Sequence, residues 1–248
     1  AGGALWKVFV PLVAIGALAT SLYFAYQIFG RRGAANDSES ASIGADGSSR
    51  GAPAIPEFVH NSLFQKPADE LLVFAVPTQT DRASELKTFS QRLEEFLALT
   101  SKKRGLIEIR AQDVENRDLA VDQLFSLFGA TILPKEFLLA KFSPDPTFFV
   151  WRDGGGLWPG IVLELKKGEN WLFLRKDVAG LEQSRKMESF FLRSPGAAAE
   201  EFKNVTVGGQ PMRKLEFSSG ASFTYGWFRG YLIFSASEEG LKEALVRL

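Results

Sequence analysis

The chain has 248 residues, of which 46% are hydrophobic and 22 are phenylalanine, so its C-terminal part can bury a full core. Lysine and arginine together number 29, as do aspartate and glutamate, and this balance disfavours a nucleic-acid partner, because such proteins neutralise phosphates. The sequence holds no cysteine and one histidine, His60, which excludes disulfides, thiolate metal sites and cysteine nucleophiles within it.

Residues 1–30 are predicted to be a transmembrane anchor. Residues 8–30 carry no charge, and 23 residues of helix span about 34 Å, more than the hydrocarbon thickness of about 30 Å. Trp6 and Tyr26 lie near the two ends, where aromatic rings favour the interface. The alternatives are a buried soluble helix and a cleaved signal peptide. The apolar run continues well past the cleavage-like residues 17–19, which favours an uncleaved anchor that contacts the lipid bilayer.

The orientation of this anchor follows from two opposing observations. Arg31 and Arg32 follow the span while Lys7 precedes it, and the positive-inside rule taken literally places the following domain in the cytoplasm. A margin of one charge is small, however, and the family resemblance described below favours the opposite orientation. We therefore expect a single-pass protein of the plasma membrane with an extracytoplasmic C-terminal domain.

Residues 31–57 are predicted to be a flexible linker. They consist mostly of glycine, alanine, serine and acidic residues, which bury too little surface to offset the entropy of ordering. A linker of 27 such residues has an end-to-end distance of about 30 Å. It would hold the next domain near the bilayer while leaving it free to reorient.

Residues 58–248 are predicted to form a domain that opens with a strand and a helix. Residues 67–77 are an apolar run of strand length bounded by prolines. Leucines and phenylalanines between residues 86 and 97 fall on one face of a helix, for which Asp81 is the predicted N-cap. Residues 105–110 then form a predicted short strand.

The middle of the domain is predicted to contain one more helix and three strands. The helix covers residues 119–128, with Asp118 as its cap. The strands cover residues 136–142, 147–152 and 160–167, and turns that contain proline and glycine separate them.

The last third alternates helix and hairpin. Residues 169–186 could form a strand or a helix, and their apolar spacing favours a helix. A hairpin turning at residues 208–209 follows. The chain ends in an amphipathic helix, for which Ser235 with Glu238 has capping-box spacing and Ser237 is the rival cap.

The final hairpin, "SFTYGWFRGYLIFS", is the strongest signature of fold in the chain. Phe223, Tyr225 and Trp227 alternate along its first arm, which indicates one face packed on a core. The same alternation sends Phe228 and Tyr231 outward, so these two rings are the predicted binding surface.

Together these elements predict an α+β domain, with a mostly antiparallel sheet and helices packed on one face, preceded by one transmembrane helix. "PADELLVF" at Pro67 and "PKEFLLAKF" at Pro134 both place a proline and an acidic residue before an apolar run. This likeness suggests that the domain consists of two structurally similar halves.

Catalytic motifs are sparse in the sequence. The three glycines at residues 154–156 match neither nucleotide-binding pattern and are expected to join two strands. There is no G-x-S-x-G motif, and a Ser-His-Asp triad would depend on His60. Adjacent acidic pairs such as Glu94-Glu95 diverge by about 100° on a helix, although two carboxylates could still meet through the fold. We expect no cofactor and no metal.

Three segments of the C-terminal third carry a family resemblance. They are "GLEQSRKMESFFLRSPG", "VTVGGQPMRKLEF" and "FTYGW" followed by "GYLIFSASEEGLKEAL", within residues 180–245. In this order they resemble a family of bacterial membrane-anchored proteins that is known only as a domain of unknown function. The resemblance implies an extracytoplasmic α+β domain behind one membrane helix, and it supplies no catalytic residue that could be carried over to this chain.

The sequence therefore favours a non-catalytic module that binds or scaffolds a component of the cell envelope, either a protein or a glycan. The first alternative is an envelope hydrolase that uses carboxylates, which requires two acids to converge in one cleft. The second is a regulatory domain that faces the cytoplasm. An exposed apolar patch or groove would support the binding module.

Overall fold

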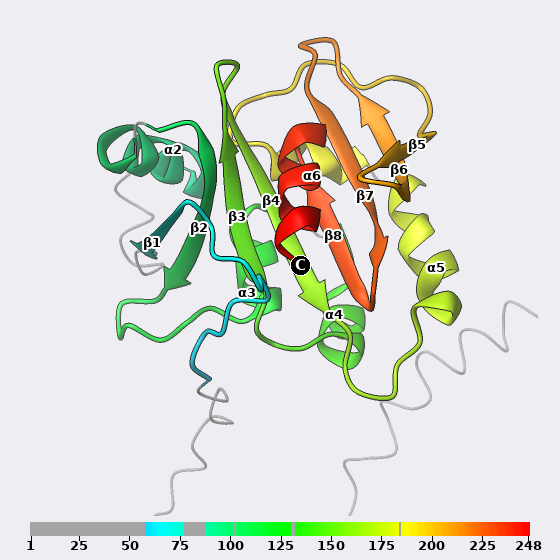
Figure 1. The fold of residues 1–248 in the computed structure, drawn as a ribbon, viewed down its shortest axis with the longest axis horizontal. Helices are drawn as coiled ribbons and strands as arrows, with labels where there is room; N and C mark the ends of the chain where they lie inside the picture. The colour runs from blue at the N-terminus through cyan, green and yellow to red at the C-terminus, as the bar shows by residue number, and fades with distance from the viewer. Residues whose placement is uncertain (1–57, 77–87, 102, 130–131, 184) are drawn as a thin grey trace, which may run out of the picture. The chain divides into compact units, whose positions relative to one another are not determined.

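The computed structural model describes residues 58–76, 88–101, 103–129, 132–183 and 185–248 (Figure 1). The predicted anchor at residues 1–30 and linker at residues 31–57 lie outside this part. Within it, no helix is both long enough and apolar enough to cross a membrane.

The domain is built on one open sheet of eight strands. The order across the sheet is β1-β2-β3-β4-β8-β7-β6-β5. Among the described strand pairs only β1–β2 is parallel, so the predicted mostly antiparallel sheet is confirmed. The strands are β1 (Glu70–Ala75), β2 (Gly105–Gln112), β3 (Thr147–Arg152), β4 (Leu157–Glu164), β5 (Lys203–Val207), β6 (Gln210–Glu216), β7 (Ser222–Phe228) and β8 (Tyr231–Ser235).

Helices cover both faces of this sheet, so the expected arrangement on one face is wrong. One face packs against α2, α3, α4 and α5, and α6 lies on the other face (Figure 1). The reason is visible in β3, where residues 147–151 are all buried, because a central strand that is apolar on both faces needs a layer on each. The helices are α2 (Phe89–Thr100), α3 (Val121–Leu127), α4 (Lys135–Lys141), α5 (Trp171–Ala179) and α6 (Glu238–Arg247), with 3-10 turns η2 (Gly180–Gln183) and η3 (Arg185–Phe190).

The two hairpins of the last third are confirmed in detail. β5 and β6 turn at Gly208-Gly209, and β7 and β8 turn at Arg229-Gly230. Phe223 and Tyr225 are buried in the core under α2 to α5, as their alternation predicts. The N-cap of α6 is Ser237, whose hydroxyl accepts a hydrogen bond from the N–H of Gly240.

Three local predictions are wrong. Residues 135–141 form α4 where the sequence predicts a strand over residues 136–142, because a seven-residue apolar run has no decisive period and only Leu138 is buried within the helix. The N-cap of α2 is Thr88, in a capping box with Gln91, whereas Asp81 lies outside the described residues. Asp118 does not cap α3, because its carboxylate is engaged by three other groups described below.

The segment from residue 58 to residue 68 enters across the face that carries α6. The N–H groups of Gln65 and Lys66 donate to the carbonyl of Arg247, at 2.7 and 3.2 Å. Asp69 then accepts hydrogen bonds from the N–H of Leu106 and from the Arg247 guanidinium. Residues 65–69 are therefore bound to the C-terminal end of α6.

Candidate functional site

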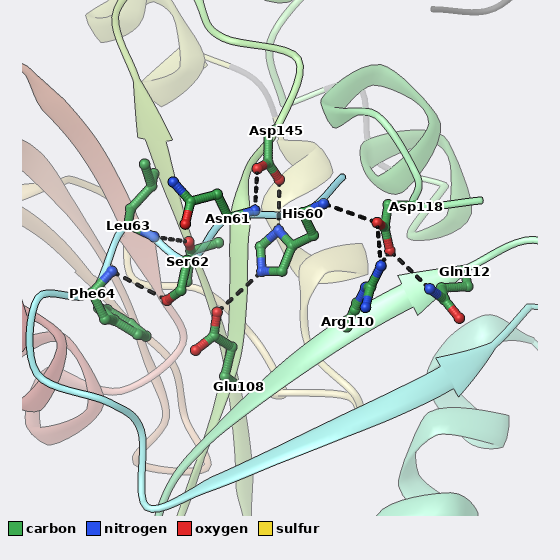
Figure 2. Close-up of polar contacts among 11 residues, drawn as sticks. His60, Asn61, Ser62, Leu63, Phe64, Glu108, Arg110, Gln112, Asp118 and Asp145 are labelled. Carbon is green, nitrogen blue, oxygen red and sulfur yellow. Dashed lines mark hydrogen bonds and ion pairs between the residues drawn. The ribbon is translucent and has the colours of Figure 1, made fainter. Parts of the chain in front are cut away.

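Two groups of polar side chains have the density expected of a site. The first, which we call the His60 cluster, comprises His60, Glu108, Arg110, Asp118 and Asp145 (Figure 2). The second lines a cleft beside α5. In the His60 cluster the charged groups pair with one another, whereas in the cleft several basic groups have no described acidic partner. This difference decides which of the two is the better candidate for a ligand site.

The His60 imidazole lies between two carboxylates. Its Nδ1 is 2.6 Å from Asp145 Oδ1, and its Nε2 is 3.1 Å from Glu108 Oε1 (Figure 2). Burial alone would lower the pKa of His60, but the hydrogen bonds to Asp145 and Glu108 and their negative charges outweigh it and raise the pKa to about 9. His60 is therefore an imidazolium at neutral pH, with both ring N–H groups donated.

Asp118 forms the second half of the His60 cluster. The Arg110 guanidinium donates to both of its oxygens at 2.6 and 2.7 Å, and the Gln112 amide and the His60 backbone N–H donate to it as well. Burial would raise the pKa of Asp118, but these hydrogen bonds, that from Arg110 foremost, lower it to about 2. Both oxygens of Asp118 therefore accept hydrogen bonds from these groups and do not cap the N-terminus of α3.

The His60 cluster is closed to substrates. The cavity at its edge has a volume of about 10 Å³, roughly the space for one water molecule. Both ring nitrogens of His60 bond to carboxylates, so the base of a Ser-His-Asp triad is not available there. Within the described part of the chain, no set of three or more acidic and histidine side chains is placed to hold a metal ion.

The second group lines a cleft between α5, η2 and strands β6 and β7, which we call the α5 cleft. Its volume is about 620 Å³, within the range of small-ligand sites. Its lining combines aromatic and basic side chains, chiefly Trp171, Trp227, Tyr225, Arg175, Lys176, Arg213 and Arg229, with the acid Glu182.

A series of rings forms the aromatic wall of the α5 cleft. Trp227 stacks on the buried Phe142 with a centroid distance of 6.2 Å and an interplanar angle of 15°. Trp171 follows at 6.3 Å, and the Arg175 guanidinium lies over the Trp171 ring at 5.7 Å. Core packing therefore fixes the wall, and its outer end carries a cation.

The inner end of the α5 cleft is held by an internal ion pair. Arg213 donates to both oxygens of Glu182 at 2.7 and 2.6 Å, and the Tyr225 hydroxyl donates to the same carboxylate at 2.6 Å. The hydrogen bonds from Arg213 lower the pKa of Glu182, and burial, reinforced by the Glu182 charge, raises the pKa of Tyr225. Arg213 and Tyr225 thus bind the Glu182 carboxylate from two sides.

The outer rim of the α5 cleft keeps its charges available. Arg175, Lys176 and Arg229 are exposed, and no described carboxylate forms an ion pair with them. Among the described lining residues, Glu182 is the only acid, and Arg213 neutralises it. The rim thus presents three positive charges beside an aromatic wall.

Arg229 is held at this rim by an unusual backbone. Its φ is 49° and that of Gly230 is 90°, so both central residues of the hairpin turn are left-handed, as a type I′ turn requires. Asparagine or glycine is favoured at the first of these positions, and a bulky side chain there costs on the order of 1 kcal/mol. The Arg229 guanidinium packs over the Phe228 ring at 4.8 Å.

The predicted binding rings lie beside the α5 cleft rather than in it. Phe228 and Tyr231 are register partners at the end of the last hairpin, half-buried against the core under α6. Burial raises the pKa of Tyr231, and Tyr231 borders a second depression formed by the loop of residues 165–170. Sequence reasoning found the correct hairpin and missed the α5 cleft, whose only signal was the mixture of aromatic and basic residues in "NWLFLRK".

Comparison with known proteins identified no relative. No protein-family model, curated protein or solved structure matches the chain. The resemblance to a membrane-anchored family therefore stays a prediction, and the geometry of the two clusters carries the functional argument.

Proposed function

We propose that this domain is a non-catalytic binding module, held at the plasma membrane by residues 8–30, that binds an anionic ligand with a flat apolar body in the α5 cleft. One observation carries the proposal: three basic side chains that pair with no described carboxylate lie around rings that core packing holds in place. The unknown envelope protein or glycan predicted from the sequence is narrowed to a partner that presents such a group.

The aromatic wall and the basic rim of the α5 cleft would bind different parts of the ligand. Trp171 and Trp227 offer apolar area that a flat ligand can cover without ordering new side chains. Arg175 and Arg229 can donate charge-assisted hydrogen bonds to an anion. Because Arg213 forms an ion pair with Glu182, it holds the inner end of the α5 cleft in place and adds little net charge.

A carboxylate-based hydrolase has weaker support. The acids that converge, Glu108 and Asp145, face the His60 imidazolium beside a cavity of about 10 Å³. The α5 cleft is large enough for a substrate, but its described lining offers only Glu182, which Arg213 and Tyr225 occupy. General acid-base chemistry needs a free carboxyl group within hydrogen-bond reach of a substrate.

The ligand class can be tested with a matched pair of probes. The full chain in zwitterionic lipid nanodiscs would be titrated calorimetrically with 2-naphthalenesulfonate and with the neutral 2-naphthalenesulfonamide. We expect the sulfonate to bind at least about tenfold more tightly, because only it pairs with the rim cations. The double variant Arg175→Gln/Lys176→Gln should lose most of this preference.

The control removes the same charge elsewhere. Lys103→Gln/Arg104→Gln changes an exposed basic pair before β2, remote in the sheet order from β6 and β7, and should leave the sulfonate affinity unchanged. Equal affinity for both probes, or an equal loss in the two double variants, would refute an anion site in the α5 cleft.

The proposed location is extracytoplasmic, as the sequence predicts. Protease protection of a C-terminal tag in intact and lysed cells tests it, and protection from external protease in intact cells would point to the cytoplasmic alternative.

A further inference from the structure

The first turn of α5 exposes large apolar side chains next to the α5 cleft. Leu172 is 55% exposed and Phe173 is 80% exposed, whereas Leu174, the next residue, is buried in the core. Trp171 lies half-buried at the boundary between the two environments. We call Trp171, Leu172 and Phe173 the α5 tip, and exposed apolar side chains clustered in this way mark an interaction surface.

Basic side chains surround the α5 tip on three sides. Lys166 and Lys167 precede it in an exposed loop, Arg175 and Lys176 follow it, and Arg229 approaches from the β7–β8 turn. The Lys166 ammonium also donates to the carbonyl of Leu139 in α4, which holds the loop against that helix.

The nearby acids reduce this charge only in part. Glu169 pairs with Lys141 of α4 at 3.0 Å, so its charge is already matched. Glu164 and Asp177 are exposed at the edges of the region. With the Lys141–Glu169 pair set aside, two acids stand against the five bases named above, and the region keeps a net positive charge.

We propose that the α5 tip docks the domain on an anionic lipid bilayer. Helices that lie in a membrane interface have this composition. They expose Leu and Phe, place Trp at the boundary, and carry Lys and Arg around the apolar side chains. Long basic side chains can keep their charges among lipid phosphates while their stems cover apolar surface. Complementary charge thus selects a bilayer with anionic headgroups as the occupant.

The organisation of the chain favours the same occupant. The sequence predicts that the uncharged residues 8–30 enter a bilayer and that residues 31–57 form a linker with an end-to-end distance of about 30 Å. A surface on such a tether meets lipid at a high effective concentration, so weak docking would be populated. Figure 1 places the start of the described chain at the same end of the domain as the loop before α5.

This inference and the proposed ligand share Trp171, Arg175, Lys176 and Arg229, but they can be tested at different residues. Leu172 and Phe173 do not line the α5 cleft, and Lys166 and Lys167 line only the neighbouring depression. Changes at these four positions test docking and leave the described lining of the cleft intact, so either proposal can fail while the other stands.

The test uses the lack of native cysteines in the sequence. A single Leu172→Cys variant of the full chain would be labelled with an environment-sensitive fluorophore and reconstituted in nanodiscs. The discs would contain phosphatidylcholine alone or with about a third phosphatidylglycerol. With the anionic lipid we expect a blue-shifted emission, about threefold weaker quenching by aqueous acrylamide, and strong quenching by nitroxide-labelled lipid.

Two controls define the result. Leu99→Cys places the same label on an exposed leucine of α2, 83% exposed, where no lipid contact is expected. Lys166→Gln/Lys167→Gln in the Leu172→Cys background should restore acrylamide quenching, whereas Lys103→Gln/Arg104→Gln should not.

Three outcomes would overturn the proposal. The Leu172 label could be equally exposed in both discs, or equally shielded in both. It could also be shielded from acrylamide without quenching by nitroxide-labelled lipid, which would indicate a protein partner such as a second copy of the chain. The naphthalenesulfonate titration of the Lys166→Gln/Lys167→Gln variant should match the unmodified chain in every case.

Discussion

The His60 cluster and the α5 cleft contain the same kinds of side chains but differ in how their charges are matched. In the His60 cluster, two cations and three carboxylates bond to one another beside a cavity with room for about one water molecule. In the α5 cleft, one acid faces four bases around about 620 Å³ of open space. Charged side chains that already pair with one another stabilise the fold, whereas basic side chains without an acidic partner can bind an anionic ligand.

This comparison also shows why the chain's only histidine is a poor guide to its function. His60 attracts attention as a general base, yet the structure surrounds it with carboxylates that keep it protonated. The basic residues of α5 look like an ordinary solvated helix face in the sequence. Only their position beside Trp227, from a distant strand, turns them into a candidate site.

Breaking the His60 cluster should have the largest effect on stability. His60→Ala leaves Glu108, which is 4% exposed, and Asp145 without the imidazolium that lies between them. We expect the free energy of unfolding of the full chain to fall by about 2–3 kcal/mol in denaturant titrations. Lys203→Ala, which removes an exposed pair with Glu216, should cost less than about 0.5 kcal/mol. Similar losses in the two variants would contradict the assigned role.

The His60 cluster should also make stability depend on pH. The pKa of His60 is raised from 6.5 to about 9 in the folded domain, so its contribution is fully present below pH 6.5 and is lost as pH rises through 9. Because water still reaches the imidazole in part, we expect a decrease on the order of 2 kcal/mol between these values. Thermal unfolding followed by tryptophan fluorescence measures it, and His60→Gln should remove this slope while other groups keep theirs.

Substitutions of Arg229 should change stability least, and they separate the effect on stability from the effect on ligand binding. Arg229→Asn should relieve about 1 kcal/mol of left-handed strain and lose about 0.5 kcal/mol of cation–π contact with Phe228, for a net gain near 0.5 kcal/mol. The same change should weaken binding of naphthalenesulfonate to the α5 cleft.

Arg229→Gln provides the matched control for that prediction. It removes the charge and keeps the left-handed strain, so it should weaken sulfonate binding as Arg229→Asn does while stability does not rise. Denaturant titration and calorimetry of the two variants separate the effects. An increase in stability without any loss of binding would remove Arg229 from the proposed site.

Local patterns in the sequence determined much of the architecture. Period-two spacing correctly predicted the β7–β8 hairpin and its inward rings, and the glycines at residues 208–209 correctly predicted the β5–β6 turn. These signals succeed because alternation and turn chemistry are properties of neighbouring residues. Charge balance and the lack of cysteine likewise depend on no structure.

Tertiary structure decided the rest, because the decisive partners are far apart in the sequence. Asp118 has the local features of a cap, yet Arg110 and the backbone of His60, 58 residues away, bind its carboxylate instead. Residues 135–141 became a helix because their apolar run is too short to define a period and packing chose between the alternatives. The α5 cleft exists only where α5 meets β6 and β7, and no spacing within one segment can encode such a meeting.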